Sequence, residues 1–518
     1  MIARLRANIP RHLLVGLLLF AAISGTTIFL FHGSINSPDE AANLLFIRSW
    51  REHRQLSVAV PIVQPAAYPL FPRSTIPMSQ SIVPAGFVGL PILFGTISIM
   101  VGEWAVFFLT TLFTMIAAVG WWYLMRQIFG RAVADISFWL FLFHPAVLYY
   151  SVRGLFPNML MMDLVIISVA GAWYASLNRA RIFWVLAAVA AVLAAAVRAP
   201  EAVGLLALVC IVALVWGNRK TRMVSAAAFG IIIILSALTL LLRNFGLIPG
   251  SYQFIELDSL YSLLFPFGIH LGRVWETTTA FIVQLFAPWV LLSSAGLAWW
   301  LWRAIKTKKF DRTVAAYLTV IVPASFWLFI MYGSWTFSDN LRDPNAVTLG
   351  ASYVRYWLPH LLFRMPFAAV LVLACIEHWK VPAQKIVRAF IVVMIMLGLW
   401  RAFAGVDGLR WLLQETAQSR ATTTDMLNHV PENAVVAVRA WDKFIYPHRA
   451  VLQPFPRDVR TLGAVHELLS RGTPVYAFVE TFKAPDEWWL RDNGVVARVV
   501  GVYGVHTLYG LYLWNEGQ

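Results

Sequence analysis

The sequence predicts a polytopic α-helical membrane protein of about 11 transmembrane helices with a small extracytoplasmic α/β domain at its C-terminus. Of the 518 residues, 59% are hydrophobic and 13% are charged, whereas an ordinary soluble domain carries roughly a quarter charged residues. Apolar runs of about 20 residues, each long enough to cross a bilayer as a helix, recur along most of the chain. This composition excludes a soluble enzyme, a disordered protein and a secreted disulfide scaffold.

The cysteines and the net charge fit the same class. Both cysteines, Cys210 and Cys375, fall inside apolar runs, which argues against a disulfide framework and against a cysteine metal site. The net charge is +15. In a membrane protein such an excess is expected from cytoplasmic Lys and Arg that orient the helices, and binding of anionic lipid head groups is a second use. Nucleic acid is not an expected partner.

The first apolar stretch, Leu13–Phe31, follows the basic, acid-free N-terminus MIARLRANIPRH. No small-residue cleavage site follows this stretch, so it is predicted to be a retained first helix with its N-terminus in the cytoplasm. A polar, Pro-rich first outer loop, 32–79, comes next.

The stretch at about 80–101 is apolar but contains two prolines and three glycines, which suit a short helix that does not cross the membrane. If it does not cross, the basic clusters of the later loops all lie in the cytoplasm; if it crosses, they all lie outside. The positive-inside rule therefore favours a non-spanning helix. The remaining predicted spans are 104–125, 132–150, 158–176, 182–198, 200–216, 223–242, 277–302, 313–332, 353–376 and 386–403.

The chain is thus predicted to have two domains, a transmembrane module at 1–404 and an extracytoplasmic α/β domain at 405–518. In the second domain long apolar runs stop and the charged fraction rises. Short runs with strand-like composition alternate there with one helix-like piece near Val459–Arg471. The strand-like runs are Ala434–Val438, Val475–Val479, Val495–Val502 and Thr507–Trp514.

The most informative polar residues are Asp39 and Glu40, in the string SPDEAANLLF just beyond the first helix. One interpretation is structural: Asp39 is an N-cap and Glu40 favours the positive end of a helix dipole. The other is chemical: a carboxylate at the membrane surface takes a proton from an acceptor hydroxyl or amine as a general base.

The arrangement resembles the membrane-embedded GT-C glycosyltransferases, which include protein O-mannosyltransferases, the aminoarabinose transferase of lipid A and oligosaccharyltransferase catalytic subunits. In these families an acidic pair or a single Asp follows the first helix, as Asp39 and Glu40 do here. The resemblance covers roughly residues 10–405 as an ordered series of short motifs. The further matching strings are RQIFG at 126–130, HPAVLYYSVRGLFPNML at 144–160 and RYWLP at 355–359.

The resemblance implies an inverting transfer of a sugar from a polyprenyl or dolichyl phosphate carrier to a protein, lipid or glycan acceptor on the outer membrane face. Asp39 would be the general base and Glu40 would assist it. Asn158 stands where the family has a second acidic residue, which in the oligosaccharyltransferase branch helps to hold a divalent metal. Because hard cations prefer carboxylate oxygens, Asn158 argues for the branch that uses sugar monophosphate lipids without a metal. No cofactor is expected.

Several cationic and aromatic residues are candidates for binding the donor phosphate, which gains charge as the sugar leaves. The planar fork of an arginine suits phosphate oxygens. The candidates are Arg355, Tyr356, Arg198 and Arg73, with Arg153 and Asn158 near the substrate. Arg198 has a second interpretation, because it could simply pair with Glu201 three residues on.

Two rival functions remain open at this point. A transporter or flippase of a lipid-linked sugar would have ionisable residues near the middle of the membrane and repeated halves with broken helices. A non-catalytic assembly protein would bind a partner through its outer domain and would tolerate loss of the Asp39–Glu40 pair.

Overall fold

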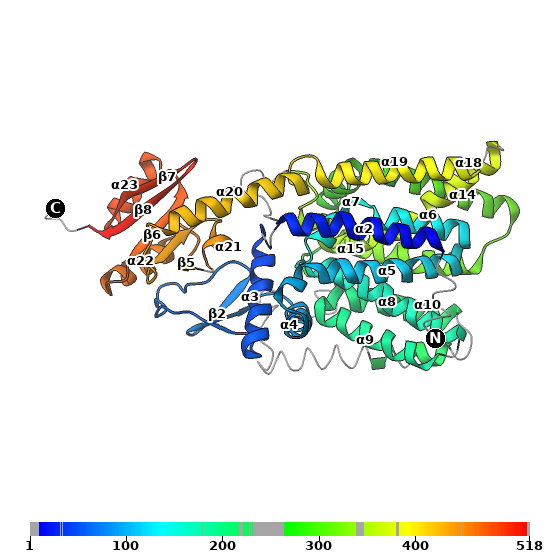
Figure 1. The fold of residues 1–518 in the computed structure, drawn as a ribbon, viewed down its shortest axis with the longest axis horizontal. Coiled ribbons are helices and arrows are strands. Elements are labelled where there is room, and N and C mark those ends of the chain that lie inside the picture. The colour runs from blue at the N-terminus through cyan, green and yellow to red at the C-terminus, as the bar shows by residue number, and fades with distance from the viewer. Residues whose placement is uncertain are drawn as a thin grey trace. The chain divides into compact units, whose positions relative to one another are not determined.

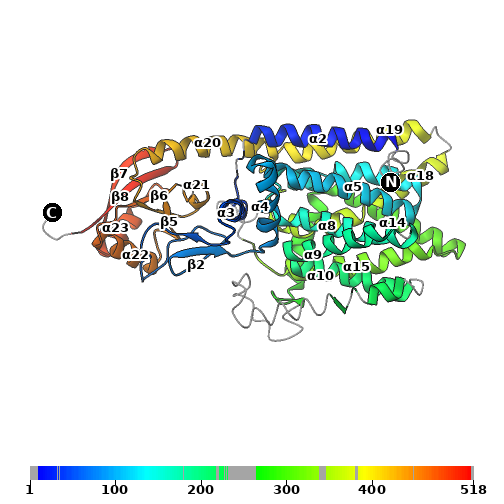
Figure 2. The ribbon, with the colours of Figure 1, turned by 60° about the horizontal axis from the view of Figure 1, so that its bottom comes forward.

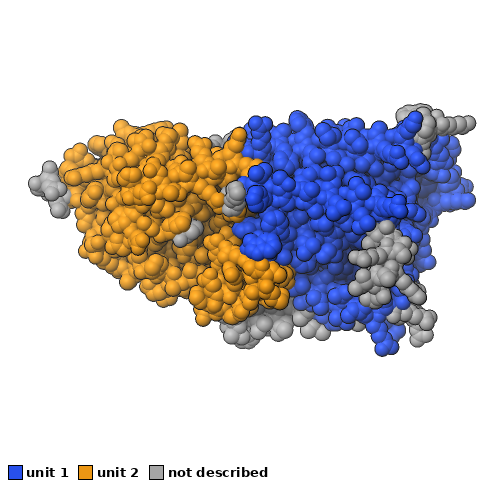
Figure 3. Space-filling model, in the orientation of Figure 1, with its two compact units in different colours: residues 1–32, 104–248, 253–411 blue, residues 33–103, 249–252, 412–518 orange. Residues whose placement is uncertain are grey.

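The computed structural model describes residues 10–31, 33, 35–178, 180–216, 221–226, 228, 230–231, 264–337, 346–379, 383–446 and 448–514. The chain forms two compact units (Figure 3). Unit 1 comprises residues 1–32, 104–248 and 253–411, and unit 2 comprises residues 33–103, 249–252 and 412–518. The first outer loop therefore groups with the C-terminal segment, whereas the predicted domain boundary at 404/405 stays a prediction.

Unit 1 is a bundle of apolar helices, the longest of which run side by side (Figures 1 and 2). Its helices are α2 (Arg11–Phe31), α5 (Val106–Phe129), α6 (Arg131–Leu142), α7 (Pro145–Val152), α8 (Pro157–Asn178), α9 (Arg181–Val197), α10 (Ala199–Trp216), α13 (Leu271–Thr278), the π-helix η2 (Thr279–Gln284), α14 (Ala287–Thr307), α15 (Arg312–Gly333), α16 (Ser352–Tyr356), α17 (Leu358–Phe363), α18 (Met365–Trp379) and α19 (Ala383–Phe403). A short 3-10 turn, η1 (Glu103–Ala105), precedes α5. Helix α20 (Leu409–Leu427) follows α19 in the chain, and its residues from 412 on belong to unit 2.

The helices match the predicted spans. Among the described residues, seven helices are long and apolar enough to cross a bilayer, or nine if each of two bent pairs is one span. Helix α9 has 17 residues, the lower end of the length that spans a bilayer. Each predicted span except one coincides with one of these helices. The exception, 223–242, lies largely outside the described residues. The orientation of the termini stays a prediction.

Two predicted spans are bent rather than straight. Helices α6 and α7 meet at an angle of 50°, and the segment Leu271–Gln284 meets α14 at 98°. Both breaks precede a proline in the first turn of the second helix, Pro145 and Pro288. Proline has no N–H to continue the ladder of hydrogen bonds and clashes with the preceding turn. At the first break, His144 caps α7 by accepting a hydrogen bond from the Ala146 N–H at 3.3 Å.

The apolar stretch 80–101 begins as a strand, so the predicted helix is too long at its N-terminal end. Residues Ser81–Pro84 form β3, and helix α4 covers only Gly89–Val101. The 13 residues of α4 extend about 20 Å at 1.5 Å per residue, short of the ~30 Å hydrocarbon core. The length agrees with a helix that does not cross.

Unit 2 is an α/β unit with a mixed five-stranded sheet of order β5-β4-β6-β8-β7. Strands β5, β4 and β6 are parallel, and β8 pairs antiparallel with β6 and β7. The strands are β4 (Val435–Val438), β5 (Ala450–Leu452), β6 (Val475–Glu480), β7 (Val495–Tyr503) and β8 (His506–Leu513); the helices of this segment are α21 (Asp442–Ile445), α22 (Val459–Ser470) and α23 (Ala484–Asp492). The four predicted strands and the predicted helix are present, and β5, α21 and α23 are additional.

The first loop, 32–79, supplies another part of unit 2. It contains α3 (Pro38–His53), β1 (Val58–Ala59) and β2 (Thr75–Met78), and both strands pair with β3, just beyond the loop, in a small antiparallel sheet of order β1-β3-β2. Strand β4 is buried on both faces, so its alternate side chains enter two cores. Val435 and Ala437 pack in one core that also contains Phe46 of α3 and Leu70 of the loop. The loop and the C-terminal segment therefore fold as one body.

Candidate functional site

The two carboxylates of the first loop lie in the first turn of α3. Ser37 is the N-cap, with extended backbone, and its Oγ accepts a hydrogen bond from the Asp39 N–H at 3.3 Å. Pro38 occupies the first helical position, where its missing N–H costs nothing. The interpretation of Asp39 as the N-cap is therefore wrong, because Ser37, two residues earlier, fills that position.

Asp39 and Glu40 have different surroundings. The Glu40 side chain is buried, with 4% exposure, and its Oε2 accepts a hydrogen bond from the Asn36 N–H at 3.4 Å. Asp39 is half-buried, and its Oδ1 accepts a hydrogen bond from the Ser74 hydroxyl at 2.6 Å. Asp39 is thus the more accessible carboxylate, whereas Glu40 braces the start of the helix.

Arg73 lies next to Ser74 and is held by the C-terminal segment. Its backbone N–H and its Nε each donate to a carboxylate oxygen of Asp442 at 2.9 Å, and its Nη2 donates to the Ala440 carbonyl at 2.9 Å. The Asp442 side chain is fully buried, and that of Arg73 is 31% exposed. The structure gives Arg73 an anchoring contact, and its role toward phosphate stays a prediction.

Unit 1 brings Arg153 and Arg355 together around one aromatic ring. Each guanidinium carbon lies 4.8 Å from the centroid of Phe156. Arg153 also donates to the Tyr149 hydroxyl at 2.7 Å, and Arg355 donates to the Ser352 hydroxyl at 2.8 Å. Both arginines are nearly buried, with 8% and 9% exposure. Two positive charges in a low-dielectric setting attract an anion more strongly than they would in water.

Arg198 and Tyr356 continue the same cluster. The ring of Tyr356 lies 5.2 Å from the Arg355 guanidinium and 4.7 Å from that of Arg198. The ring of Tyr332 stacks on that of Tyr356, with 4.2 Å between the ring centroids. We call Arg153, Arg355, Tyr356 and Arg198 the arginine cluster.

Arg198 does pair with Glu201, as one of its two interpretations holds. Its Nε donates to the Glu201 carboxylate at 2.8 Å, its Nη2 contacts the same oxygen, and the Tyr332 hydroxyl donates to that oxygen as well. The Glu201 side chain is 1% exposed. The pairing neutralises much of the Arg198 charge.

Asn158 is buried in the first turn of α8, with 2% exposure. Its side-chain amide nitrogen has no hydrogen-bond partner among the described residues. An amide at this position supplies a donor and no negative charge. Within the described ranges, no three His, Cys, Asp or Glu side chains come together as a metal site would require; independence from a metal stays a prediction.

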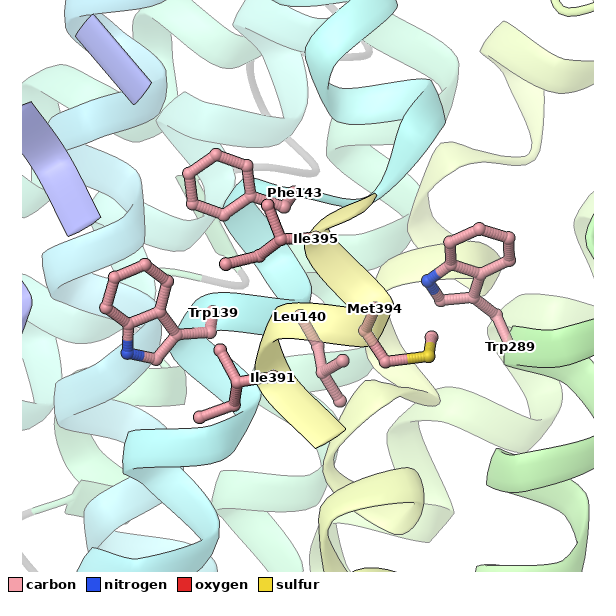
Figure 4. A pocket seen from close by; sticks show the side chains of 7 residues that line it. All are labelled: Trp139, Leu140, Phe143, Trp289, Ile391, Met394 and Ile395. Carbon is pink, nitrogen blue, oxygen red and sulfur yellow. The ribbon is translucent and has the colours of Figure 1, made fainter. Parts of the chain in front are cut away.

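An apolar hollow lies elsewhere in unit 1 (Figure 4). Its lining comes from α6 and the residue after it, from α14 and from α19, and consists of Trp139, Leu140, Phe143, Trp289, Ile391, Met394 and Ile395. No charged side chain lines it. The hollow therefore offers no group that would bind a phosphate, and the candidate functional residues are those of the arginine cluster and those around Asp39.

The contacts of Ser74 and Asp442, and the capping role of Ser37, were not predicted from the sequence. Ser37 and Glu40 form the S-x-x-E spacing of a capping box, which would have identified the helix start. Nothing local signals the other two, because Ser74 meets Asp39 across 35 residues and Asp442 meets Arg73 across 369.

These observations define a multi-pass membrane protein with an α/β unit built from its first loop and its C-terminal segment. No protein-family profile matches the chain, and no curated protein matches it in sequence. Solved structures do match. ArnT from Cupriavidus metallidurans bound to undecaprenyl phosphate is similar over 95% of this chain and 97% of that chain, with a TM-score of 0.57 and 15% identity.

A second similar structure is the archaeal oligosaccharyltransferase AglB from Archaeoglobus fulgidus in complex with an inhibitory peptide and a dolichol-phosphate. It covers 90% of this chain and 69% of that chain, with a TM-score of 0.52 and 12% identity. The apo form of the Archaeoglobus oligosaccharyltransferase has the same TM-score and identity. The chain therefore has the GT-C fold, as the resemblance predicted.

Proposed function

We propose that this protein is a glycosyltransferase that moves a sugar from a polyprenyl or dolichyl phosphate carrier to a protein, lipid or glycan acceptor on the outer membrane face. The observation that carries the proposal is the half-buried Asp39 carboxylate at the start of α3, held by the Ser74 hydroxyl. The GT-C fold supports it, as does the undecaprenyl phosphate in the ArnT structure.

In the proposed reaction the acceptor hydroxyl or amine attacks the anomeric carbon of the sugar and gives its proton to Asp39. The bond between that carbon and the phosphate oxygen breaks, and the carrier leaves as a phosphate anion. Arg355 and Arg153 stabilise the charge that develops on the phosphate, with Tyr356, Arg198 and Arg73 as further donor-phosphate candidates. Asn158 is a candidate for a neutral contact to the substrate. Glu40 braces the turn that carries Asp39.

The test compares wild type, Asp39→Asn and Asp492→Asn, each present in membranes in matched amounts. Asp492 is an exposed carboxylate at the end of α23, so its variant makes the same change of charge away from the candidate base. A panel of labelled polyprenyl phosphate sugars is supplied with an envelope extract as a source of acceptor. Transfer by Asp39→Asn is expected to fall by about 10²- to 10⁴-fold, the usual contribution of a general base, with Asp492→Asn unaffected.

Two results would contradict the proposal at different levels. Full transfer by Asp39→Asn would remove its assignment as the base and leave the reaction class intact. Absence of label transfer by wild type from every donor in the panel, with the acceptor extract present, would contradict sugar transfer itself.

Transport of a lipid-linked sugar is the second candidate, and one observation favours it. Asp163 is fully buried in α8, about 9 Å from its N-terminal end at 1.5 Å per residue, where it accepts a hydrogen bond from the Thr114 hydroxyl at 2.7 Å. A buried acid together with two bent helix pairs is a combination that transporters use. Movement of a lipid-linked sugar across vesicles that is lost in Asp163→Asn, without sugar transfer, would establish this candidate.

A further inference from the structure

The short helix α21 of the C-terminal segment holds the first loop on both sides of Asp39. On one side Asp442 is fully buried and receives the backbone N–H and the Nε of Arg73, each at 2.9 Å. Because Arg73 also donates to the Ala440 carbonyl, both its backbone and its side chain are fixed by the residues around α21. A hydrogen bond to a charged group is stronger than a neutral one, so this is a firm anchor.

Ser74, the residue after Arg73, connects the anchored Arg73 to Asp39. Ser74 has a φ of +62°, a left-handed conformation that is unfavourable for a residue with a side chain and persists only where the surrounding structure enforces it. In this conformation its hydroxyl donates to the Asp39 Oδ1 at 2.6 Å. The anchored Arg73 therefore holds Ser74 where its hydroxyl meets the carboxylate.

Lys443, the next residue of α21, acts on the other side. Its Nζ donates to the Asn36 backbone carbonyl at 2.7 Å and to the Asn36 Oδ1 at 2.8 Å. Asn36 precedes the N-cap Ser37, and its own N–H donates to Glu40. The start of α3 is thus fixed by Lys443 before the helix begins, and Asp39 lies between the two anchors.

We propose that Asp442 and Lys443 are positioning residues for the Asp39 carboxylate, acting through Arg73–Ser74 and through Asn36. The inference rests on the proposed function, and it gives the C-terminal α/β segment a role in the reaction: it holds the carboxylate of the general base in place. Catalysis by a base depends on its reach to the proton it abstracts, and small misplacements of reacting groups reduce rates strongly.

The test uses the full chain in membranes and the variants Asp442→Asn, Lys443→Met and Ser74→Ala. Each is expected to lower kcat by about 10- to 100-fold. The KM for the lipid donor is expected to stay unchanged in Lys443→Met and Ser74→Ala, whose partners Asn36 and Asp39 are not donor-phosphate candidates. Asp486→Asn is the matched control, because this carboxylate also accepts from an arginine, Arg457, at 2.6 Å within unit 2. The control is expected to retain its kcat.

A double variant separates positioning from mere structural support. If Asp442 acts only through Asp39, then adding Asp442→Asn to Asp39→Asn will cause no further loss, because residues that act as a unit are non-additive. If Asp442→Asn lowers kcat by the same factor in wild type and in Asp39→Asn, the proposal is overturned. Unchanged kcat in all three single variants would overturn it as well. Ser74→Ala removes only one hydroxyl, so it keeps the test decisive even where Asp442→Asn fails to fold.

A second measurement does not depend on transfer. Backbone hydrogen exchange in segments 36–41 and 73–76 is expected to quicken at least severalfold in Asp442→Asn and Lys443→Met, and not in Asp486→Asn. If wild type shows no transfer but exchange quickens, the proposed function fails while the two anchors stand. If exchange is unchanged, α21 does not hold the loop and the inference fails whatever the enzyme does.

Discussion

The pair of Arg198 and Glu201 allows a quantitative prediction about unit 1. The two side chains are 11% and 1% exposed, and Glu201 accepts hydrogen bonds from Arg198 and from the Tyr332 hydroxyl. Glu201→Ala would leave the Arg198 guanidinium buried without its carboxylate partner. Breaking a buried ion pair in this way costs about 3–5 kcal/mol. We therefore expect Glu201→Ala to lower the free energy of unfolding by roughly this amount.

Arg198→Ala is expected to lower the free energy of unfolding by a similar amount, because it leaves the buried Glu201 carboxylate without its cationic partner. The double variant should cost less than the two single costs together, by the coupling energy of the pair, since removing both charges leaves neither unpaired. A coupling energy of about 1.5–3 kcal/mol is expected, in the upper part of the range for residues in direct contact. This non-additivity is the signature of the pair, and a general loss of packing would not produce it.

The free energy of unfolding is measured on the purified proteins in mixed micelles, by following the loss of structure as the mole fraction of dodecyl sulfate increases. All four proteins of the cycle are compared under one micelle composition. A cost below about 1 kcal/mol for Glu201→Ala is the value typical of an exposed ion pair. That value, or additive single costs, would refute the argument that the buried pair stabilises the bundle.

Two further predictions concern helix packing and helix capping. A Cβ on Gly296 of α14 would lie 1.8 Å from the Phe367 carbonyl oxygen of α18, so Gly296→Ala is expected to lower the free energy of unfolding by about 1–3 kcal/mol in the same micelle titration. Gly272 has open space around it, so the control variant Gly272→Ala should stay within about 0.5 kcal/mol of wild type. Equal effects of the two variants would contradict the packing argument. Asp458 caps α22, and its hydrogen bond from Arg460 lowers the pKa of its carboxyl group. The ionised carboxylate therefore stabilises the folded state above the unfolded pKa of about 3.9. This contribution to stability is lost as the pH falls through the lowered pKa of the folded state. Asp458→Ala should therefore cost about 1 kcal/mol at pH 7 and less at pH 3, measured as the ratio of hydrogen exchange rates of α22 in variant and wild type; an effect that grows on acidification would refute the sign.

The roles of the candidate residues depend on contacts that a local pattern does not contain. Arg73 was predicted from its place in the first loop, and the structure pairs it with Asp442 across 369 residues. Arg198 had two interpretations, and the structure supplies Glu201 together with Tyr332, which lies 131 residues further on. The charged partner of Arg73 is distant in sequence, whereas that of Arg198 lies three residues away and only its Tyr332 contact is distant.

The sequence by itself determined the membrane class, the places of nearly all spans and the helix that starts at the SPDE string. These are local properties: in a bilayer each backbone N–H and C=O must be satisfied within its own helix, so hydropathy along the chain is enough to find the spans. The helix start is local too, because a serine cap, a proline and two acids lie within four residues. Only the tertiary structure decided that the first loop and the C-terminal segment share a hydrophobic core, because burial depends on which apolar faces meet. It also decided that Arg73 pairs with Asp442 and that Arg198 adopts the local pairing with Glu201 that its spacing allowed, because spacing permits a contact and only packing brings the two groups together.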